Sequence, residues 1–359
     1  MPGGRDLKND VINTSLCALC GACLDWCPYI KNLDDNLVIT FDCNVTDGRC
    51  YSVCPRTHTD WKLITEKFFS DAESTNEIGN LKKVYLVKSL EPVPGQQDGG
   101  AVSALLKTAL EENFAEGLLL TTTGESIEPV SFIGHDLKDI SRAAGSKFMA
   151  STGLRKIMEA SQQGIRSLLM VGRPCQIQAL RKMQMKNIDQ LKDMEVFSIG
   201  LFCMWSLSWD FMDYLQHEYP GAKIESMAIP RHGVEIITSE GAKSFSTDKI
   251  KEYIRPGCHY CLDMTSELAD ISVGAFEAEN GWNTLIVRNS RGIRLLRHAV
   301  EKGLLQVEEY PADQLQFLKQ ASFNKKARNL YNIKELVELK AVKTPVELSH
   351  YQYLEGVNS

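Results

Sequence analysis

The sequence of 359 residues lacks the signals of several protein classes. No apolar run approaches the roughly 20 residues of a membrane-spanning helix, and one of the longest covers only residues 198–205. There is no block of Lys or Arg, and 46 acidic residues outnumber 40 basic ones, which argues against nucleic-acid binding. The first residues lack the apolar stretch of a secretion signal. We therefore expect a cytoplasmic protein with no membrane span of its own, either free or held at a membrane by a partner.

Common nucleotide-binding and hydrolytic motifs are also absent. No G-x-G-x-x-G follows a predicted strand and no G-x4-G-K-[ST] occurs, so neither a standard dinucleotide fold nor a P-loop is expected. No Ser–His pair or carboxylate dyad stands out as catalytic machinery.

Cysteine, by contrast, is abundant and unevenly distributed. Seven of the 11 cysteines fall within the first 54 residues. An odd number of cysteines in a chain without an export signal argues against a disulfide framework. Cysteine of this density therefore predicts metal binding.

The first four cysteines form a recognisable motif. The stretch Cys17-Ala-Leu-Cys20-Gly-Ala-Cys23-Leu-Asp-Trp-Cys27-Pro28 has the spacing C-x2-C-x2-C-x3-C-P of bacterial ferredoxins. A zinc knuckle is the alternative, but it usually combines paired C-x2-C ligands with His, and the nearest histidine is His58. The motif favours iron–sulfur clusters.

A second half-motif contains Cys43, Asp47, Cys50 and Cys54-Pro55. The cross-over of ferredoxin ligands predicts that Cys54 joins the first cluster and Cys27 the second. Asp47 stands where a cysteine is expected, and a carboxylate ligand would make its iron harder and more exchangeable. Alternatively, Asp47 only solvates the loop, and the second cluster is 3Fe–4S or open at one iron. The two predicted ligand sets are Cys17, Cys20, Cys23 and Cys54 for the first cluster, and Cys27, Cys43, Cys50 and Asp47 for the second.

The remaining chain has the pattern of an α/β protein. Residues 1–80 are loop-rich and have few apolar positions for a core, so they need a stabilising group such as a metal cluster. We expect a short helix and a polar linker over residues 62–82. Beyond them we expect strands at 83–88, 117–122, 167–171 and 195–201, and helices at 102–114, 152–162 and 174–185. A β-rich insertion is expected at 226–250 and a helical extension from about 311. The predicted fold is thus a mixed α/β core domain, residues 81–359, after a small ferredoxin-like domain, residues 1–80.

Four cysteines lie in this second part. Cys175 and Cys203 each follow a predicted buried strand, at the sheet edge where α/β proteins place their sites. Cys258 and Cys261 have ligand spacing in a Gly-led turn. Scattered cysteines are often only small buried apolar residues, but four is the number that a third 4Fe–4S cluster needs.

Five ordered motifs between residues 83 and 300 resemble those of the family of coenzyme F420 hydrogenase/dehydrogenase beta subunits. The motifs are Asp98-Gly99-Gly100-Ala-Val-Ser-Ala-Leu-Leu, Ala144-Gly145-Ser146-Lys147-Phe148, Pro174-Cys175-Gln176-Ile177-Gln-Ala-Leu-Arg-Lys182, Leu201-Phe202-Cys203, and Arg255-Pro256-Gly257-Cys258-x2-Cys261 with Ala269-Asp270-Ile271-Ser272-Val-Gly274. With its N-terminal cysteine motifs, the whole arrangement is similar to that of F420H2 dehydrogenase electron-input subunits.

The resemblance implies bound FAD, hydride exchange with reduced F420, and a core 4Fe–4S cluster held by the four later cysteines. It places Gly99, Gly100, Ser146 and Lys147 at the flavin or its cosubstrate. A Gly-Gly pair that opens a helix can present backbone amides to a pyrophosphate. A plain turn for the glycines and a surface position for Lys147 remain alternatives. Asp263 and Asp270 either orient the cluster loop or the isoalloxazine ring, or have only capping roles in the local backbone.

The predicted protein is an iron–sulfur flavoprotein that splits a hydride into single electrons. Its expected partners are other subunits of a redox complex or a soluble ferredoxin. NAD(P)H as hydride carrier is the first alternative, a non-catalytic relay subunit the second, and a reductase with its own organic substrate the third. Arg173 stands where the family commonly has a small residue. It would place a cation beside a cluster ligand and so raise the reduction potential of that cluster.

Overall fold

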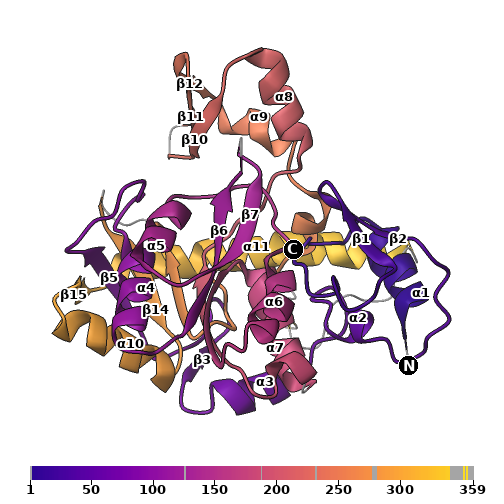
Figure 1. The fold of residues 1–359 in the computed structure, drawn as a ribbon, viewed down its shortest axis with the longest axis horizontal. Helices are drawn as coiled ribbons and strands as arrows, with labels where there is room; N and C mark the ends of the chain where they lie inside the picture. The colour runs from indigo at the N-terminus through magenta and orange to yellow at the C-terminus, as the bar shows by residue number, and fades with distance from the viewer. Residues whose placement is uncertain are drawn as a thin grey trace.

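The computed structural model describes residues 2–124, 127–186, 188–230, 233–276, 281–339, 351, 353 and 354. Its centre is a mixed eight-stranded sheet (Figure 1). Four neighbouring strands at its centre, β13, β9, β8 and β6, are parallel, and the strands on both sides of them are antiparallel. In spatial order the strands are β15 (Leu305–Glu309), β5 (Lys83–Ser89), β14 (Asn283–Val287), β13 (Ile271–Gly274), β9 (Glu195–Leu201), β8 (Ser167–Gly172), β6 (Gly117–Thr123) and β7 (Pro129–Gly134).

Helices cover both faces of this sheet. Side chains of a strand alternate between faces, so Leu118 and Leu120 of β6 pack in one core and Leu119 packs in the other. The first face carries α4 (Ala101–Glu111), α5 (Leu137–Ala143) and α10 (Ser290–Glu301). The second carries η2 (Gly153–Arg155), α6 (Lys156–Gln162), α7 (Pro174–Met185) and η3 (Asp189–Leu191). The prediction of an α/β core is confirmed, with the predicted strands and helices in place.

The predicted β-rich insertion is also confirmed. A three-stranded antiparallel sheet projects from the main body together with two helices (Figure 1). Its own apolar core contains the fully buried Phe211, Leu215 and Ile236. The elements are α8 (Asp210–Glu218), β10 (Ile224–Ala228), β11 (Val234–Thr238), β12 (Gly241–Phe245) and α9 (Thr247–Lys251).

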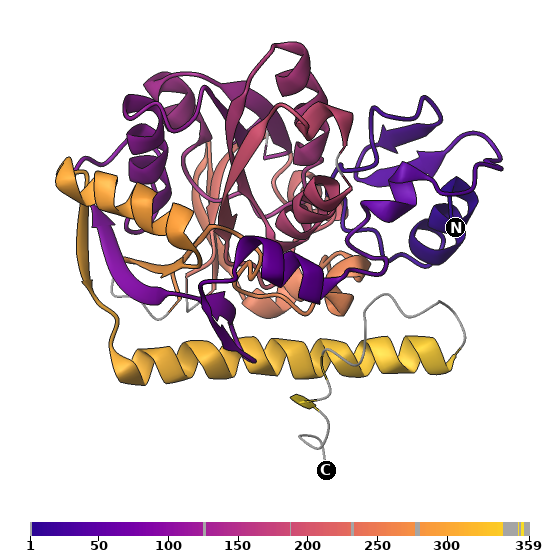
Figure 2. The ribbon, with the colours of Figure 1, turned by 90° about the horizontal axis from the view of Figure 1, so that it is seen from below.

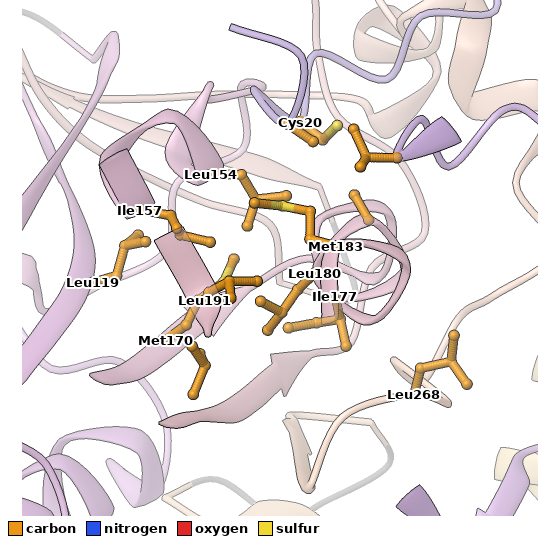
Figure 3. Close-up of a cluster of buried hydrophobic side chains, with 14 of the residues drawn as sticks. Cys20, Leu119, Leu154, Ile157, Met170, Ile177, Leu180, Met183, Leu191 and Leu268 are labelled. Carbon is orange, nitrogen blue, oxygen red and sulfur yellow. The ribbon is translucent and has the colours of Figure 1, made fainter. Parts of the chain in front are cut away.

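Residues 2–54 form short elements at one side of the sheet domain, and the elements of residues 61–81 lie beneath it in the view of Figure 1 (Figures 1 and 2). They do not build their core alone: Ala18, Cys20 and Val53 belong to the apolar cluster formed by α6 and α7. Figure 3 shows Cys20 at the edge of that cluster, next to Leu154. The elements are α1 (Gly4–Leu7), η1 (Lys8–Ile12), β1 (Ile30–Leu33), β2 (Asn36–Ile39), α2 (Arg49–Ser52), α3 (Trp61–Phe68), β3 (Glu73–Thr75) and β4 (Gly79–Leu81).

The expectation of a polar linker before residue 82 is wrong. After α3 the chain forms the hairpin β3–β4, and Ile78 at its turn is fully buried. Buried Arg288 donates to the carbonyls of Ile78 and Asn80, which fixes the hairpin to the sheet domain. Backbone carbonyls make these contacts, so the side chains of the segment can be polar without loosening its attachment.

A long helix, α11 (Ala312–Glu338), runs along the base of the sheet domain toward the N-terminal unit (Figure 2). It contacts the 3-10 helix η4 (Pro256–Tyr260), and Asn329 donates to the carbonyls of Cys258 and Cys261. This confirms the predicted helical extension as far as Glu338; residues 340–350 lie outside the described part. No helix among the described residues has the length and apolar character needed to cross a membrane.

Candidate functional site

Four N-terminal cysteines gather where the N-terminal unit meets the sheet domain. Burial raises the pKa of the Cys20 thiol well above its ordinary value, and the sulfurs of Cys54, Cys175 and Cys17 raise it further. Burial also raises the pKa of Cys23 well above its ordinary value, and the sulfurs of Cys20, Cys17, Cys54 and Cys50 add to the increase. These mutual effects require the four sulfurs to be close in space. We call this the inner group: Cys17, Cys20, Cys23 and Cys54.

A second set of cysteines lies at the outer side of the N-terminal unit. Burial raises the pKa of Cys50, and the sulfurs of Cys43 and Cys27 contribute to the increase. We call Cys27, Cys43 and Cys50 the outer group. Asp47 lies between Cys43 and Cys50 on an exposed loop and has a left-handed backbone with φ of 60°.

The four later cysteines, which we call the core group, come together although 86 residues separate the first from the last. Cys175 begins α7, Cys203 follows β9, and Cys258 and Cys261 lie in and after η4. Burial raises the pKa of Cys203 to about 12, with a contribution from the sulfurs of Cys258 and Cys175. Burial likewise raises the pKa of Cys175, to which Cys261 and Cys258 add.

None of the eleven cysteines forms a disulfide bond in the structure. Within the described ranges, no three His, Cys, Asp or Glu side chains approach closely enough to hold a single metal ion. Sulfurs within each group lie close enough for mutual electrostatic effects, and such effects also join the inner group to Cys175 and to Cys50.

A cavity of about 450 Å³ opens at the carboxyl ends of the central strands. This size lies in the range of small-molecule and cofactor sites. Its wall includes Gly100, Ser146, Lys147, Arg173 and Cys203. Three of the four residues predicted at the flavin therefore share one cavity, and a member of the core group lies in the same wall.

The fourth predicted residue, Gly99, lies behind the cavity wall. A Cβ on Gly99 would stand 2.7 Å from the backbone nitrogen of Asn283, so only glycine lets α4 start this close to β14. Gly100 is the N-cap of α4 and has a left-handed backbone with φ of 66°. The side chain of Asn283 accepts from the Ala101 N–H. The next N–H groups, of Val102 and Ser103, belong to the first turn, where amides have no partner within their helix, and both residues line the cavity.

Lys147 has a partly structural position. Its ammonium donates to the carbonyls of Ala144 (2.7 Å) and Gly145 (2.9 Å) just beyond the end of α5. Burial lowers the pKa of Lys147 to about 8. The lysine is therefore neither a freely solvated surface residue nor a side chain aimed only at a ligand. Ser146 is tied to the same wall, because its N–H donates to the side chain of Gln97.

Three buried cations lie between the cysteine groups. Arg56, Lys182 and Lys325 are at most 6% exposed. Their side chains donate to backbone carbonyls and, for Lys182, to the Thr57 hydroxyl. Among the described residues, no carboxylate forms an ion pair with any of the three, whereas buried Arg181, Arg255 and Lys326 each face one.

Buried cations without a counter-charge are costly. The electrostatic partners present are the cysteine sulfurs: Cys54 and Cys20 act on Lys182, and Lys325 acts on Cys203 and Cys261. Thiolates that carry a cluster would supply negative charge at these positions. The inner and core groups therefore fit anionic iron–sulfur clusters.

The remaining sequence-based candidates have clear positions. The Arg173 guanidinium donates to Ser206 Oγ and to the Ser151 carbonyl, and it lowers the pKa of Cys175 against the larger effect of burial. Asp270 is fully buried and pairs with Arg181 at 3.1 Å, away from the cavity wall. Asp263 accepts from the Glu267 N–H and so shapes the loop after Cys261. Both aspartates thus have structural contacts.

Sequence reasoning gave no role to the buried cations Arg56, Lys182 and Lys325, although Lys182 ends the motif that begins at Pro174. For Arg56 a signal existed, because it follows Cys54-Pro55 at once. Lys182 lies seven residues after Cys175 on α7, and Lys325 lies on α11, far from any motif. Only the tertiary packing brings these lysines to the cysteines.

Two family models match the sheet domain. Residues 84–158 match the model for the N-terminal part of the coenzyme F420 hydrogenase/dehydrogenase beta subunit, and residues 165–313 match the model for its C terminus. Together they cover more than half of the chain. The chain belongs to the family of coenzyme F420 hydrogenase/dehydrogenase beta subunits, which confirms the resemblance.

Several similar proteins are named for F420-linked redox reactions. A coenzyme F420-dependent sulfite reductase of Methanocaldococcus jannaschii is 31% identical over 338 residues, 88% of this chain and 51% of that protein, so the chain spans about half the length of that relative. The F subunit of the F(420)H(2) dehydrogenase of Methanosarcina mazei is 29% identical over 79% of this chain and 82% of its own. A polypeptide of the F420-reducing [NiFe] hydrogenase complex of Methanosarcina barkeri matches with a TM-score of 0.71 and 26% identity, covering 76% of this chain and 99% of that one.

Proposed function

We propose that this chain is an iron–sulfur flavoprotein, part of a redox complex, that exchanges a hydride with coenzyme F420 and relays the electrons singly to or from a partner protein. The F420-linked relatives support the choice of hydride carrier. The three cysteine groups support a relay with three clusters. The direction of electron flow is set by the partner and by the potentials.

The cluster ligands we propose follow the three groups. The inner and core groups each supply four cysteines for a 4Fe–4S cluster. The outer group supplies three, and we propose Asp47 on the same loop as the fourth ligand. The unpaired cations Arg56, Lys182 and Lys325 support this assignment because a cluster bound by thiolates would balance them.

The flavin site we propose is the cavity at the carboxyl ends of the central strands. The first-turn amides of Val102 and Ser103 and the α4 dipole would receive the diphosphate. Lys147 adds positive charge to the same wall and holds it to the end of α5. FAD in this site would supply the conversion between a two-electron hydride and single electrons.

One observation carries this proposal: Cys203 lines the same cavity as Gly100 and Lys147. A ligand in the cavity would therefore contact a cysteine of the core group. The core group in turn adjoins the inner group, because the sulfur of Cys175 acts on Cys20. The arrangement gives a continuous route from the cavity into the N-terminal unit.

The outer group would face the partner, either another protein of a redox complex or a soluble ferredoxin. Near the outer group, Tyr29 and Phe41 are 45% and 57% exposed, and their rings stack with centroids 4.8 Å apart. Exposed aromatic residues of this kind are common in the centres of protein interfaces. The route would thus end at a surface that a partner can cover.

The test is an anaerobic titration of the purified, cluster-loaded protein with reduced F420 and, in separate samples, with NADH and NADPH. Flavin absorbance and the broad iron–sulfur absorbance are followed together. We expect reduced F420 to bleach both within seconds and the pyridine nucleotides to bleach neither.

Each other outcome has a defined meaning. Bleaching by NADH or NADPH alone would keep the relay but overturn the choice of hydride carrier. A protein that contains no flavin and responds to none of the three donors would contradict hydride exchange and leave a pure electron relay.

A further inference from the structure

Arg56 contacts the loops of two cysteine groups at once. Its backbone N–H donates to Cys54 Sγ of the inner group at 3.5 Å. Its guanidinium donates to the carbonyl of Leu16, next to Cys17, at 3.2 Å. The same guanidinium donates to Gly257 O, next to Cys258, at 2.8 Å and to Tyr260 O at 3.4 Å.

The two loops are also in direct contact. A Cβ on Gly257 would lie 2.6 Å from the Leu16 carbonyl oxygen and 2.8 Å from that of Cys17. The residue before Cys258 therefore rests on the backbone that carries Cys17. Arg56 enters this junction from the side of Cys54 and bonds to both of its walls.

The charge of Arg56 is held between the two groups. Its side chain is 6% exposed and faces no carboxylate among the residues described. Although burial lowers the pKa of Arg56, the nearby sulfurs of Cys261, Cys175 and Cys258 raise it above its usual value. A guanidinium remains charged at all working pH values and presents a planar set of donors that an ammonium cannot reproduce.

The outer group has no equivalent of this residue in the part of the chain that the structure describes. Arg5 donates to Asn44, next to Cys43, and Arg49 directly precedes Cys50, but their side chains are 54% and 60% exposed. They pair with Asp42 and Asp189, so their charge is screened by solvent and by a carboxylate.

We propose that Arg56 is a positioning residue shared by two clusters: it ties the inner and core loops together and raises the reduction potentials of both clusters while leaving the outer cluster unaffected. The inference rests on the proposed iron–sulfur relay. A fixed cation near two clusters favours the reduced state of each, since charge and hydrogen bonds to the ligands tune their potentials.

The test is an EPR-monitored redox titration of the cluster-loaded protein with Arg56→Gln, Arg56→Lys and native chains. Arg56→Gln removes the charge and keeps a hydrogen-bond donor. Arg297→Gln is the matched control for the loss of one charge, because Arg297 is 63% exposed on α10 and pairs only with Glu301 among the described residues. Iron content is measured for every sample.

We expect Arg56→Gln to lower the potentials of two clusters together. The ratio of reduced to oxidised cluster at a fixed potential should fall about tenfold for each, which is about 59 mV for one electron. The third cluster and the Arg297→Gln protein should match the native protein. Arg56→Lys, which retains the charge, should restore most of both shifts.

A shift in only one cluster, in none, or in all three equally would overturn the proposal. If the Arg56→Gln protein does not load both clusters, the Arg56→Lys protein provides the test. A change in the ratio of reduced to oxidised cluster of less than tenfold, in the same two clusters together, supports the proposal. Any other pattern contradicts it. A native protein that holds no adjacent clusters would instead refute the proposed function, before any variant is compared.

Discussion

The inner cysteine group lies in a buried junction with the sheet domain, whereas the outer group lies at the exposed end of the same N-terminal unit. Cys20 and Cys23 of the inner group are 8% and 7% exposed. The outer group is bordered by Phe41 and Val45, at 57% and 64% exposure. One sequence motif thus supplies two environments, because its fourth cysteine, Cys27, belongs to the group farther from the sheet. The difference suits a relay that must be insulated on one side and accessible on the other.

The largest expected effect comes from removing a ligand on the buried side. Cys261→Ala should abolish reduction of the N-terminal clusters by reduced F420, since the core group would lose its cluster, while flavin reduction should persist because Cys261 does not line the cavity. Stopped-flow absorbance measures both steps. In the matched variant Cys50→Ala, reduction of the inner and core clusters should remain. Equal behaviour of the two variants would contradict the proposed route.

Stability should show the same contrast between the two sides. Asp35 is 8% exposed and pairs with buried Arg255, joining the N-terminal unit to the segment before Cys258. Asp35→Asn leaves that arginine without a counter-charge and should lower the free energy of unfolding by about 3 kcal/mol. Urea denaturation under anaerobic conditions provides the measurement.

Asp42→Asn serves as the control, because it removes an exposed pair with Arg5 near the outer group. This substitution should lower the free energy of unfolding by less than about 1 kcal/mol. If the two substitutions cost the same, the buried junction is not what holds the N-terminal unit in place.

Ligand binding at the cavity should depend on pH through Lys147. Burial lowers the pKa of Lys147 to about 8, so its charge is present at pH 7 and is lost as the pH rises to 9. Affinity for FAD should therefore fall by about tenfold over this interval, the size of one hydrogen bond to a charged group. Fluorescence titration of the flavin-free protein follows the binding.

Lys147→Met should bind FAD weakly and with little change between pH 7 and 9. The exposed Lys138→Met on α5 should retain the native pH profile. A profile that persists in the Lys147 variant would assign the titration to another group.

The smallest effect is expected at the exposed end. Asp47→Cys should keep a four-iron cluster in the outer group and alter its EPR signal, and Asp47→Ala should convert that cluster to a three-iron form. Neither change should alter the signals of the inner and core clusters, or the stability by more than about 0.5 kcal/mol, because Asp47 is exposed. Native spectra in both variants would show that Asp47 is not a ligand.

The sequence predicts the approach of the first three cysteines because their spacing is local. Cys17, Cys20 and Cys23 lie within seven residues, so the backbone alone keeps them together. The core group was predictable in part, because Cys175 and Cys203 follow neighbouring parallel strands, β8 and β9, whose carboxyl ends meet at one edge. The α/β elements of the sheet domain were predictable for the same reason, since their apolar patterns are local.

Contacts between distant segments were not predictable in this way. The hairpin β3–β4 was expected to be a linker because its anchors are backbone carbonyls, which leave no trace in composition. Lys325 reaches the core group from α11, 64 residues after Cys261. The sequence suggested that the Gly99-Gly100 pair opens a helix, but it gave no sign that Gly99 must be glycine to let α4 approach β14. Such pairings follow from the packing of the whole chain.

The most direct test of the account is a cofactor count on the native protein, purified without oxygen. Iron, sulfide and flavin analysis is combined with an EPR redox titration. The account predicts one FAD and three reducible clusters, two of them coupled magnetically to each other as neighbours at the junction. A protein with a single cluster, or with zinc in its cysteine groups and no flavin, would contradict it.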